Sequence, residues 1–167
     1  MRYFGDEVWK LTVLEISFGV GMVVGGALMA VLANKLDRIT TIISTSAGFG
    51  ILALVMGLTT NLILFYSLFF LIGLIVPAFS TSAMTLLQET VEPERQGRVF
   101  GFVGIVMAVA MPLGMAILGP LADVVSVESI LIATGALTVV IAGLAVLLPS
   151  GKRAIAAAHA STGSVGD

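Results

Sequence analysis

Cysteine is absent from the 167-residue sequence, and charged side chains are scarce. The lack of cysteine excludes disulfide bonds and thiolate metal sites, although it does not identify a compartment. Asp, Glu, Lys and Arg make up 11% of the residues, whereas soluble domains contain about 25%. Hydrophobic residues reach 58%, and the mean hydropathy is +1.13. We therefore exclude a water-soluble globule and expect an integral membrane protein.

Patterns typical of enzymes are missing as well. The sequence has no metal-ligand cluster, no Gly-rich phosphate loop and no paired Asp or Ser/His arrangement within its apolar stretches. We expect neither catalysis nor a metal or cofactor, and no nucleic acid among the partners. Residues 1–10 are short and mixed in charge, so they do not read as a cleavable signal.

Long apolar stretches dominate what is present. They cover residues 11–33, 39–58, 62–87, 99–122 and 130–148. About 20 apolar residues in a helix cross the hydrocarbon core of a bilayer. We predict an all-α bundle of five transmembrane helices in a single domain at 1–149. Residues 150–167 turn to Ala, Ser and Gly, which predicts a disordered tail.

Lys and Arg lie mostly on one side of this arrangement. Alternate connections must face opposite sides of the membrane, and the cytoplasmic side is the richer in Lys and Arg. The other side has Arg2 and Lys10. The richer side has the following residues: Lys35, Arg38, Arg95, Arg98, Lys152 and Arg153. We predict a cell-membrane protein with its N-terminus outside and its tail in the cytoplasm.

The charged loop at 88–98 is the longest interruption between apolar stretches. Pro93 suits the first turn of a helix, and Gly97 permits close backbone approach. Arg98 is placed to reach acids or helix-end carbonyls at the cytoplasmic face. Glu94 is a further candidate residue of this loop. The alternative is a solvated loop that only fixes topology, because exposed ion pairs contribute about 0–1 kcal/mol. Spacing alone favours this alternative.

The sequence contains two motifs in succession, T-L-L-Q-E-T-V-E-P-E-R-Q-G-R-V-F-G and then A-M-P-L-G-x-x-x-x-G-P-L-A-D. They resemble the connection between the tenth and eleventh helices, and then the eleventh helix, of major facilitator superfamily transporters. The branch is that of the macrolide-efflux-like drug exporters, and R-Y-F-G-D-E-x-W-x-L near the start is similar to an outer loop of that branch. The resemblance implies helices eight to twelve, without helix seven and the N-terminal half.

The same resemblance implies a function. The chain would supply one wall of a cavity through which a hydrophobic, drug-like solute leaves the cell, coupled to protons. Membrane lipid, that solute and a chain carrying the missing half would be its partners. The alternative is a truncated or accessory integral membrane protein that does not transport.

The turn after the first span is similar to a degraded version of the superfamily's cytoplasmic motif. Asn34 and Asp37 stand where the motif has Asp and Gly, beside Lys35 and Arg38. The loss of the motif's acid argues against a charged latch. We interpret Lys35 and Arg38 as fixing topology.

Within the spans, Glu15 is the notable charge. An ionised group is costly inside a bilayer, so Glu15 is a candidate for binding a proton or a cationic drug. The alternative, which we favour from its depth, is a side chain that reaches the outer interface near Lys10.

Small residues and prolines mark two of the helices. Gly21 and Gly25 have a GxxxG spacing that permits close helix approach, which we assign to packing within the chain rather than to dimerisation. The fourth span contains a second set: Pro112, Gly114, Gly119 and Pro120. This set predicts either a helix that bends during transport or a static kink.

Overall fold

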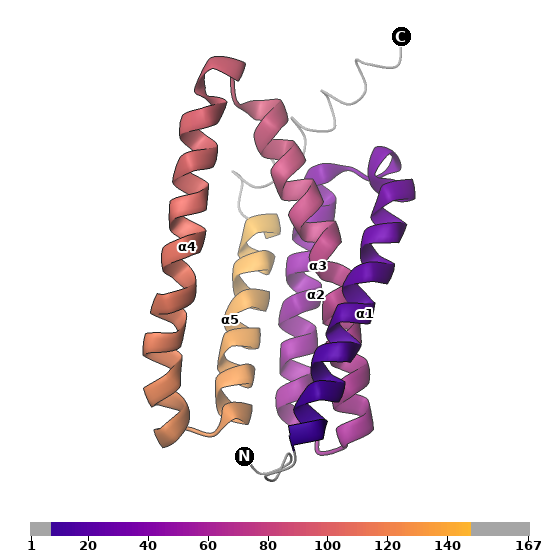
Figure 1. The fold of residues 1–167 in the computed structure, drawn as a ribbon, viewed down its shortest axis with the longest axis vertical. Coiled ribbons are helices and arrows are strands. Elements are labelled where there is room, and N and C mark those ends of the chain that lie inside the picture. The colour runs from indigo at the N-terminus through magenta and orange to yellow at the C-terminus, as the bar shows by residue number, and fades with distance from the viewer. Residues whose placement is uncertain (1–7, 148–167) are drawn as a thin grey trace.

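The structure is a computed structural model that describes residues 8–147, and every regular element in that range is a helix. The elements are α1 (Val8–Leu32), the 3₁₀ turn η1 (Ala33–Lys35), α2 (Arg38–Leu58), α3 (Leu62–Thr90), α4 (Pro93–Val124) and α5 (Val127–Leu147) (Figure 1). All five α-helices are long and apolar enough to cross a membrane. The predicted all-α bundle of five transmembrane helices is confirmed. The predicted tail lies outside the described residues.

Polar side chains cap the starts of α2 and α3. The Asp37 carboxylate accepts a hydrogen bond from the Thr40 amide at 2.9 Å, which caps α2. The Asn61 side chain accepts from the Ile63 amide at 2.9 Å and caps α3. Such caps satisfy amide groups that have no partner inside the helix. α4 begins at Pro93, which has no amide hydrogen to satisfy.

Helices extend further than the apolar stretches. The sequence predicts a loop at 88–98, but only Val91 and Glu92 lie outside α3 and α4. The 123–129 connection shrinks to Val125 and Ser126. Glu, Gln and Arg are good helix formers, so the backbone continues its hydrogen bonding beyond the apolar stretch. Hydropathy marks the hydrocarbon core and therefore underestimates helix length.

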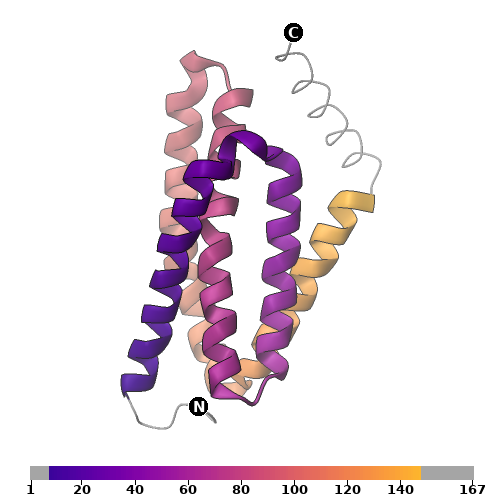
Figure 2. The same ribbon diagram turned by 90° about the vertical axis from the view of Figure 1, so that its right-hand side faces the viewer.

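Four of the helices pack through glycine. α1, α3, α2 and α5 follow one another across the bundle, and each contacts the next (Figure 2). A Cβ at Gly21 or Gly25 would collide with backbone carbonyls of α3. A Cβ at Gly50 of α2 would lie 2.9 Å from the Gly135 carbonyl of α5. Close backbone approach of this kind supplies the van der Waals contact that holds helices together in lipid.

α4 differs from the other helices. It is 32 residues long, and none of its residues is buried. It stands at one edge of the bundle, joined at its ends to α3 and α5 (Figure 1), and it forms no extensive interface with the other described helices. In a bilayer an exposed apolar side chain can face lipid, so exposure alone does not indicate a partner.

Candidate functional site

An ion pair joins two turns at one end of the bundle. The Arg38 guanidinium donates to both carboxylate oxygens of Glu89, from Nη2 at 2.8 Å and from Nε at 3.3 Å. Its Nη1 donates to the Ala33 carbonyl at 3.2 Å. Arg38 therefore connects the start of η1, the start of α2 and the end of α3. The Arg38 side chain is 28% exposed and that of Glu89 is 52% exposed, so water partly screens the pair.

The rest of the cytoplasmic-type motif serves local structure. Asp37 caps α2, as described above, and Lys35 is exposed. The side chain of Asn34 lies outside the described part of the chain. Arg38, which we had interpreted as fixing topology, also has a structural role through Glu89. Sequence reasoning did not select Glu89, because no spacing rule relates residues that are 51 positions apart.

Gln96 holds the turn between α3 and α4. Its Nε2 donates to the Gln88 and Val91 carbonyls, each at 3.1 Å, which satisfies carbonyls at the end of α3. Sequence reasoning overlooked Gln96 in favour of its charged neighbours. The sequence did offer one signal for this role, which is the position of Gln96 at the end of the first helical turn after Pro93.

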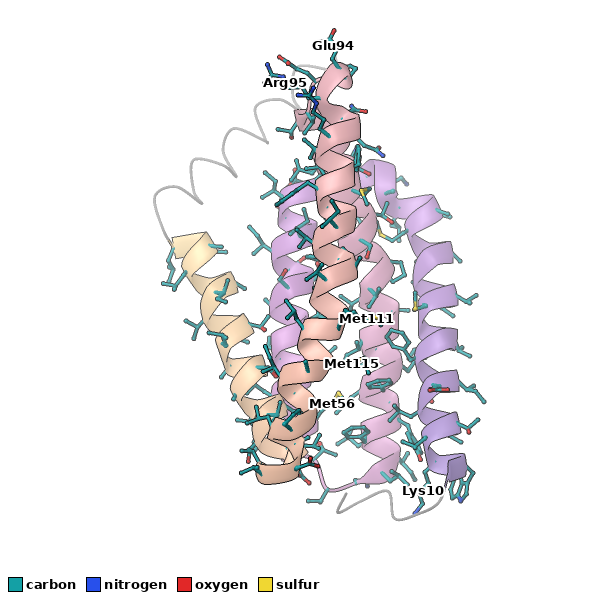
Figure 3. All side chains as sticks on the ribbon, turned by 60° about the vertical axis from the view of Figure 1, so that its left-hand side comes forward. Lys10, Met56, Glu94, Arg95, Met111 and Met115 are labelled. Atoms are coloured by element: carbon teal, nitrogen blue, oxygen red, sulfur yellow. The ribbon has the colours of Figure 1, made fainter. Side chains whose placement is uncertain are left out.

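The predicted residues of this turn are open to solvent. Glu94, Gly97 and Arg98 are all exposed, and a Cβ at Gly97 would meet no atom within 4 Å. Figure 3 places Glu94 and Arg95 at one end of the bundle and Lys10 at the other. Arg95 pairs with Glu92 at 3.3 Å, and both side chains are largely exposed. No close backbone approach at Gly97 occurs among the described residues.

Glu15 lies on α1 with its side chain exposed. It forms no ion pair with any residue that the structure describes. A shallow groove of about 410 Å³ lies between α1 and α3, and Glu15 is not part of its lining. The residues that line it are Ile16, Ser17, Val20, Ile63, Tyr66, Ser67 and Phe70. The Tyr66 hydroxyl donates to the Lys10 carbonyl at 3.2 Å and so ties the ends of these helices together.

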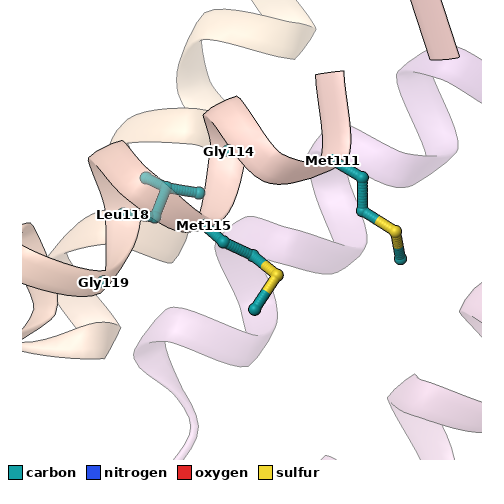
Figure 4. A pocket seen from close by; sticks show the side chains of 5 residues that line it. All are labelled: Met111, Gly114, Met115, Leu118 and Gly119. Atoms are coloured by element: carbon teal, nitrogen blue, oxygen red, sulfur yellow. The ribbon is translucent and has the colours of Figure 1, made fainter. Parts of the chain in front are cut away.

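A shallow, open depression lies on one face of α4, and we call it the α4 hollow. It has a volume of about 480 Å³ and is lined by Met111, Gly114, Met115, Leu118 and Gly119. The side chains of Met111 and Met115 project from the helix on the same side (Figure 4). The lining offers no charged group. An apolar occupant therefore fits it better than an ionic one.

The prolines of α4 do not interrupt it. The helix is continuous from Pro93 to Val124 and includes Pro112 and Pro120. Proline cannot donate to the carbonyl four residues earlier, so each leaves one weak point in the hydrogen-bond ladder. No group of three or more His, Asp or Glu that could hold a metal ion occurs between residues 8 and 147.

Comparisons with known proteins give the family. The model of the Major Facilitator Superfamily matches residues 9–163. Macrolide efflux protein A of Streptococcus pyogenes is 33% identical over 144 residues, which is 85% of this chain and 36% of the relative. The Enterococcus faecalis protein of the same name is 35% identical over 117 residues, 69% of this chain and 36% of the relative.

A third relative is more distant. The multidrug efflux pump Tap of Mycolicibacterium fortuitum is 25% identical over 150 residues, 89% of this chain and 37% of the pump. No solved structure matches the chain. The chain spans little more than a third of the length of these relatives. With a family match over nearly its whole length, it belongs to the Major Facilitator Superfamily, in the branch of the drug-efflux proteins.

Proposed function

We propose that this chain is part of a drug exporter that moves apolar, drug-like solutes out of the cell in exchange for protons. The observation that carries the proposal is the 33% identity to a macrolide efflux protein across 85% of the chain. The apolar lining of the α4 hollow supports an apolar solute, and so does the groove between α1 and α3, whose lining is mostly apolar. The chain would form one wall of the transport path.

The remaining helices would be required for transport. Helix α4 lacks an extensive interface within the described chain, although the other four helices pack closely. Secondary transporters move solutes by rocking one bundle of helices against another around a site near the middle of the membrane. A single wall cannot provide alternating access. We therefore expect no transport by this chain alone.

The distribution of Lys and Arg supports one orientation of the bundle in the membrane. Lys35, Arg38, Arg95 and Arg98 gather at one end of the bundle, and Lys10 lies at the other. The positive-inside rule then favours the end with Arg38 and Arg95 as cytoplasmic, in the cell membrane. This orientation would place Glu15 towards the outer side. From there it could take a proton during coupling.

A drug-accumulation assay tests the proposal. A hybrid exporter would carry this chain in place of the matched segment of the Streptococcus pyogenes protein, in cells that lack their own macrolide pumps. We expect low accumulation of labelled macrolide with the hybrid and unchanged accumulation with this chain alone. A protonophore should abolish the difference.

Two results would count against the proposal. A hybrid that reaches the membrane in normal amounts but leaves accumulation unchanged would favour an accessory membrane protein instead. Low accumulation with this chain alone would contradict the need for the remaining helices. The unmodified Streptococcus pyogenes protein serves as the positive control.

A further inference from the structure

The groove between α1 and α3 is bounded by two contacts of these helices. The Tyr66 hydroxyl donates to the Lys10 carbonyl at 3.2 Å, near the start of both helices. Further along, a Cβ on Gly21 would collide with the Phe70 carbonyl, so the two backbones touch there. On α1, the residues that line the groove all fall between Lys10 and Gly21. The walls of the groove are therefore held at a defined spacing.

Three hydroxyl groups are the polar side chains of this lining. The Ser17 hydroxyl donates to the Val13 carbonyl at 2.8 Å, and the Ser67 hydroxyl donates to the Ile63 carbonyl at 3.0 Å. The Tyr66 hydroxyl donates to a carbonyl as well. A carbonyl oxygen can only accept a hydrogen bond, so the hydroxyl is the donor in all three bonds.

The three hydroxyl oxygens remain open as acceptors. A hydroxyl group has one hydrogen to donate and two lone pairs that accept, and here each hydrogen is already used. Among the described residues, no group donates to any of the three oxygens. Ser17 lies on the α1 wall, and Tyr66 and Ser67 lie on the α3 wall. The side chains of the groove therefore offer hydrogen-bond acceptors on both walls and no free donor.

The rest of the lining is apolar and carries no charge. It consists of Ile16, Val20, Ile63 and Phe70. Moving an ammonium group onto such a surface without a carboxylate beside it is costly, so an uncharged donor group fits better than a cation. A lipid acyl chain would cover the apolar surface but has no hydrogen to give to the hydroxyl oxygens.

We propose that this groove binds uncharged solutes that combine an apolar body with hydroxyl or amide N–H groups, which donate to Ser17, Tyr66 and Ser67. This preference rests on the proposed function in one respect, which is that the solute is the cargo of the exporter. A solute that carries only acceptors, such as an ether or a ketone, would leave its oxygen facing another acceptor. Its binding would gain no hydrogen bond in the groove.

A matched pair of probes tests the preference. A naphthol donates one hydrogen bond, whereas its methyl ether accepts but cannot donate. Equilibrium dialysis measures the binding of each to the purified chain in detergent micelles, after subtraction of the uptake by micelles alone. Removal of all three acceptors by Ser17→Ala, Tyr66→Phe and Ser67→Ala together should weaken naphthol binding about two- to tenfold, the effect of losing one hydrogen bond. Binding of the ether should not change, which also shows that the groove is intact.

A second variant controls for the loss of hydroxyl groups elsewhere. Ser46 on α2 and Thr134 on α5 also donate to carbonyls of their own helices, each at 2.7 Å, and neither lines the groove. Ser46→Ala combined with Thr134→Val should leave the binding of both probes unchanged. A triple variant that binds naphthol as tightly as the unmodified chain, or that loses naphthol and ether binding equally, would overturn the preference. Binding of neither probe above the micelle background would also overturn it, since acyl chains would then fill the groove.

The outcomes separate this inference from the proposed function. Naphthol binding that depends on the three hydroxyl groups, without drug export by the hybrid, would leave the groove standing and contradict the exporter. Drug export by the hybrid, with naphthol binding that ignores the hydroxyl groups, would leave the exporter standing and overturn the preference.

Discussion

The missing side chain at Gly25 lets α1 approach the backbone of α3. A Cβ there would meet the Leu74 carbonyl, which cannot move without displacing the helix. A Cβ placed on Gly19, on the same helix, would have no atom within 4 Å. The two glycines therefore form a matched pair of test positions.

We predict that Gly25→Ala lowers the free energy of unfolding by about 1–3 kcal/mol, because overpacking forces the helices apart. Gly19→Ala should be neutral or raise it by up to about 1 kcal/mol, since alanine favours the helix. Denaturant titration of the protein in detergent micelles measures both values. Equal effects of the two substitutions would contradict the α1–α3 packing.

Arg38 and Glu89 provide the second test at this scale. We predict that Arg38→Gln and Glu89→Gln each lower the free energy of unfolding. The loss in the double variant should be smaller than the sum of the two single losses. The coupling should be about 1 kcal/mol or less, because Glu89 is half exposed. A double-mutant cycle in the same titration gives the coupling, and strict additivity would show that the pair contributes nothing.

Glu15 has a functional prediction. In the hybrid exporter, Glu15→Gln should lower drug export and flatten its dependence on pH, since glutamine cannot bind a proton. Glu15→Asp keeps the carboxyl group and should preserve the pH dependence. If Glu15→Gln leaves both the rate and its pH dependence unchanged, the carboxyl group has no part in coupling.

Sequence reasoning at this scale found residues that a spacing along one helix marks, and it missed residues whose partners leave no such pattern. Gly21 and Gly25 were selected from their spacing, because a GxxxG pattern defines one face of a helix. Glu89 was not selected as a site residue because its partner Arg38 is distant in sequence. Gln96 was overlooked because its contacts are with backbone carbonyls, which leave no mark in the residue pattern.

At the scale of elements, hydropathy predicted where the helices exist but not where they end. The charged segment around Glu94 and Arg98 is helical, because its residues favour a helix and Pro93 can begin one. Hydropathy cannot detect this extension, since it records only which residues suit the lipid. The continuity of α4 through Pro112 likewise could not be deduced from the sequence, which allowed either a bend or a kink.

We predict that Pro112→Ala stabilises α4 and slows export by the hybrid. Alanine restores an amide that can donate to the carbonyl four residues earlier, and this removes a weak point where the helix can bend. Amide hydrogen exchange near residue 112 should become slower, and drug-efflux rates should fall. Val109→Ala, on the same helix, is the control. Unchanged efflux with slower exchange would show that bending at Pro112 is not part of transport.

At the scale of the whole molecule, the sequence predicted the class of fold but not the pairing of helices. Consecutive helices α3 and α4 form no extensive interface, whereas α2 and α5, which are distant in sequence, pack through Gly50 and Gly135. The pairing depends on which glycine faces meet, and apolar side chains in lipid have little preference among partners. The position of α4 in the bundle could therefore be learned only from the structure.

The most direct test of the account is the orientation of this bundle in the membrane, because the direction of export and the role of Glu15 depend on it. Single cysteines at Thr60 and Glu94, both exposed and at opposite ends of the bundle, would be treated with a maleimide that cannot cross membranes. In intact cells we predict labelling of Thr60→Cys and no labelling of Glu94→Cys until the cells are permeabilised. Labelling of Glu94→Cys alone, or of both positions, in intact cells would contradict the account.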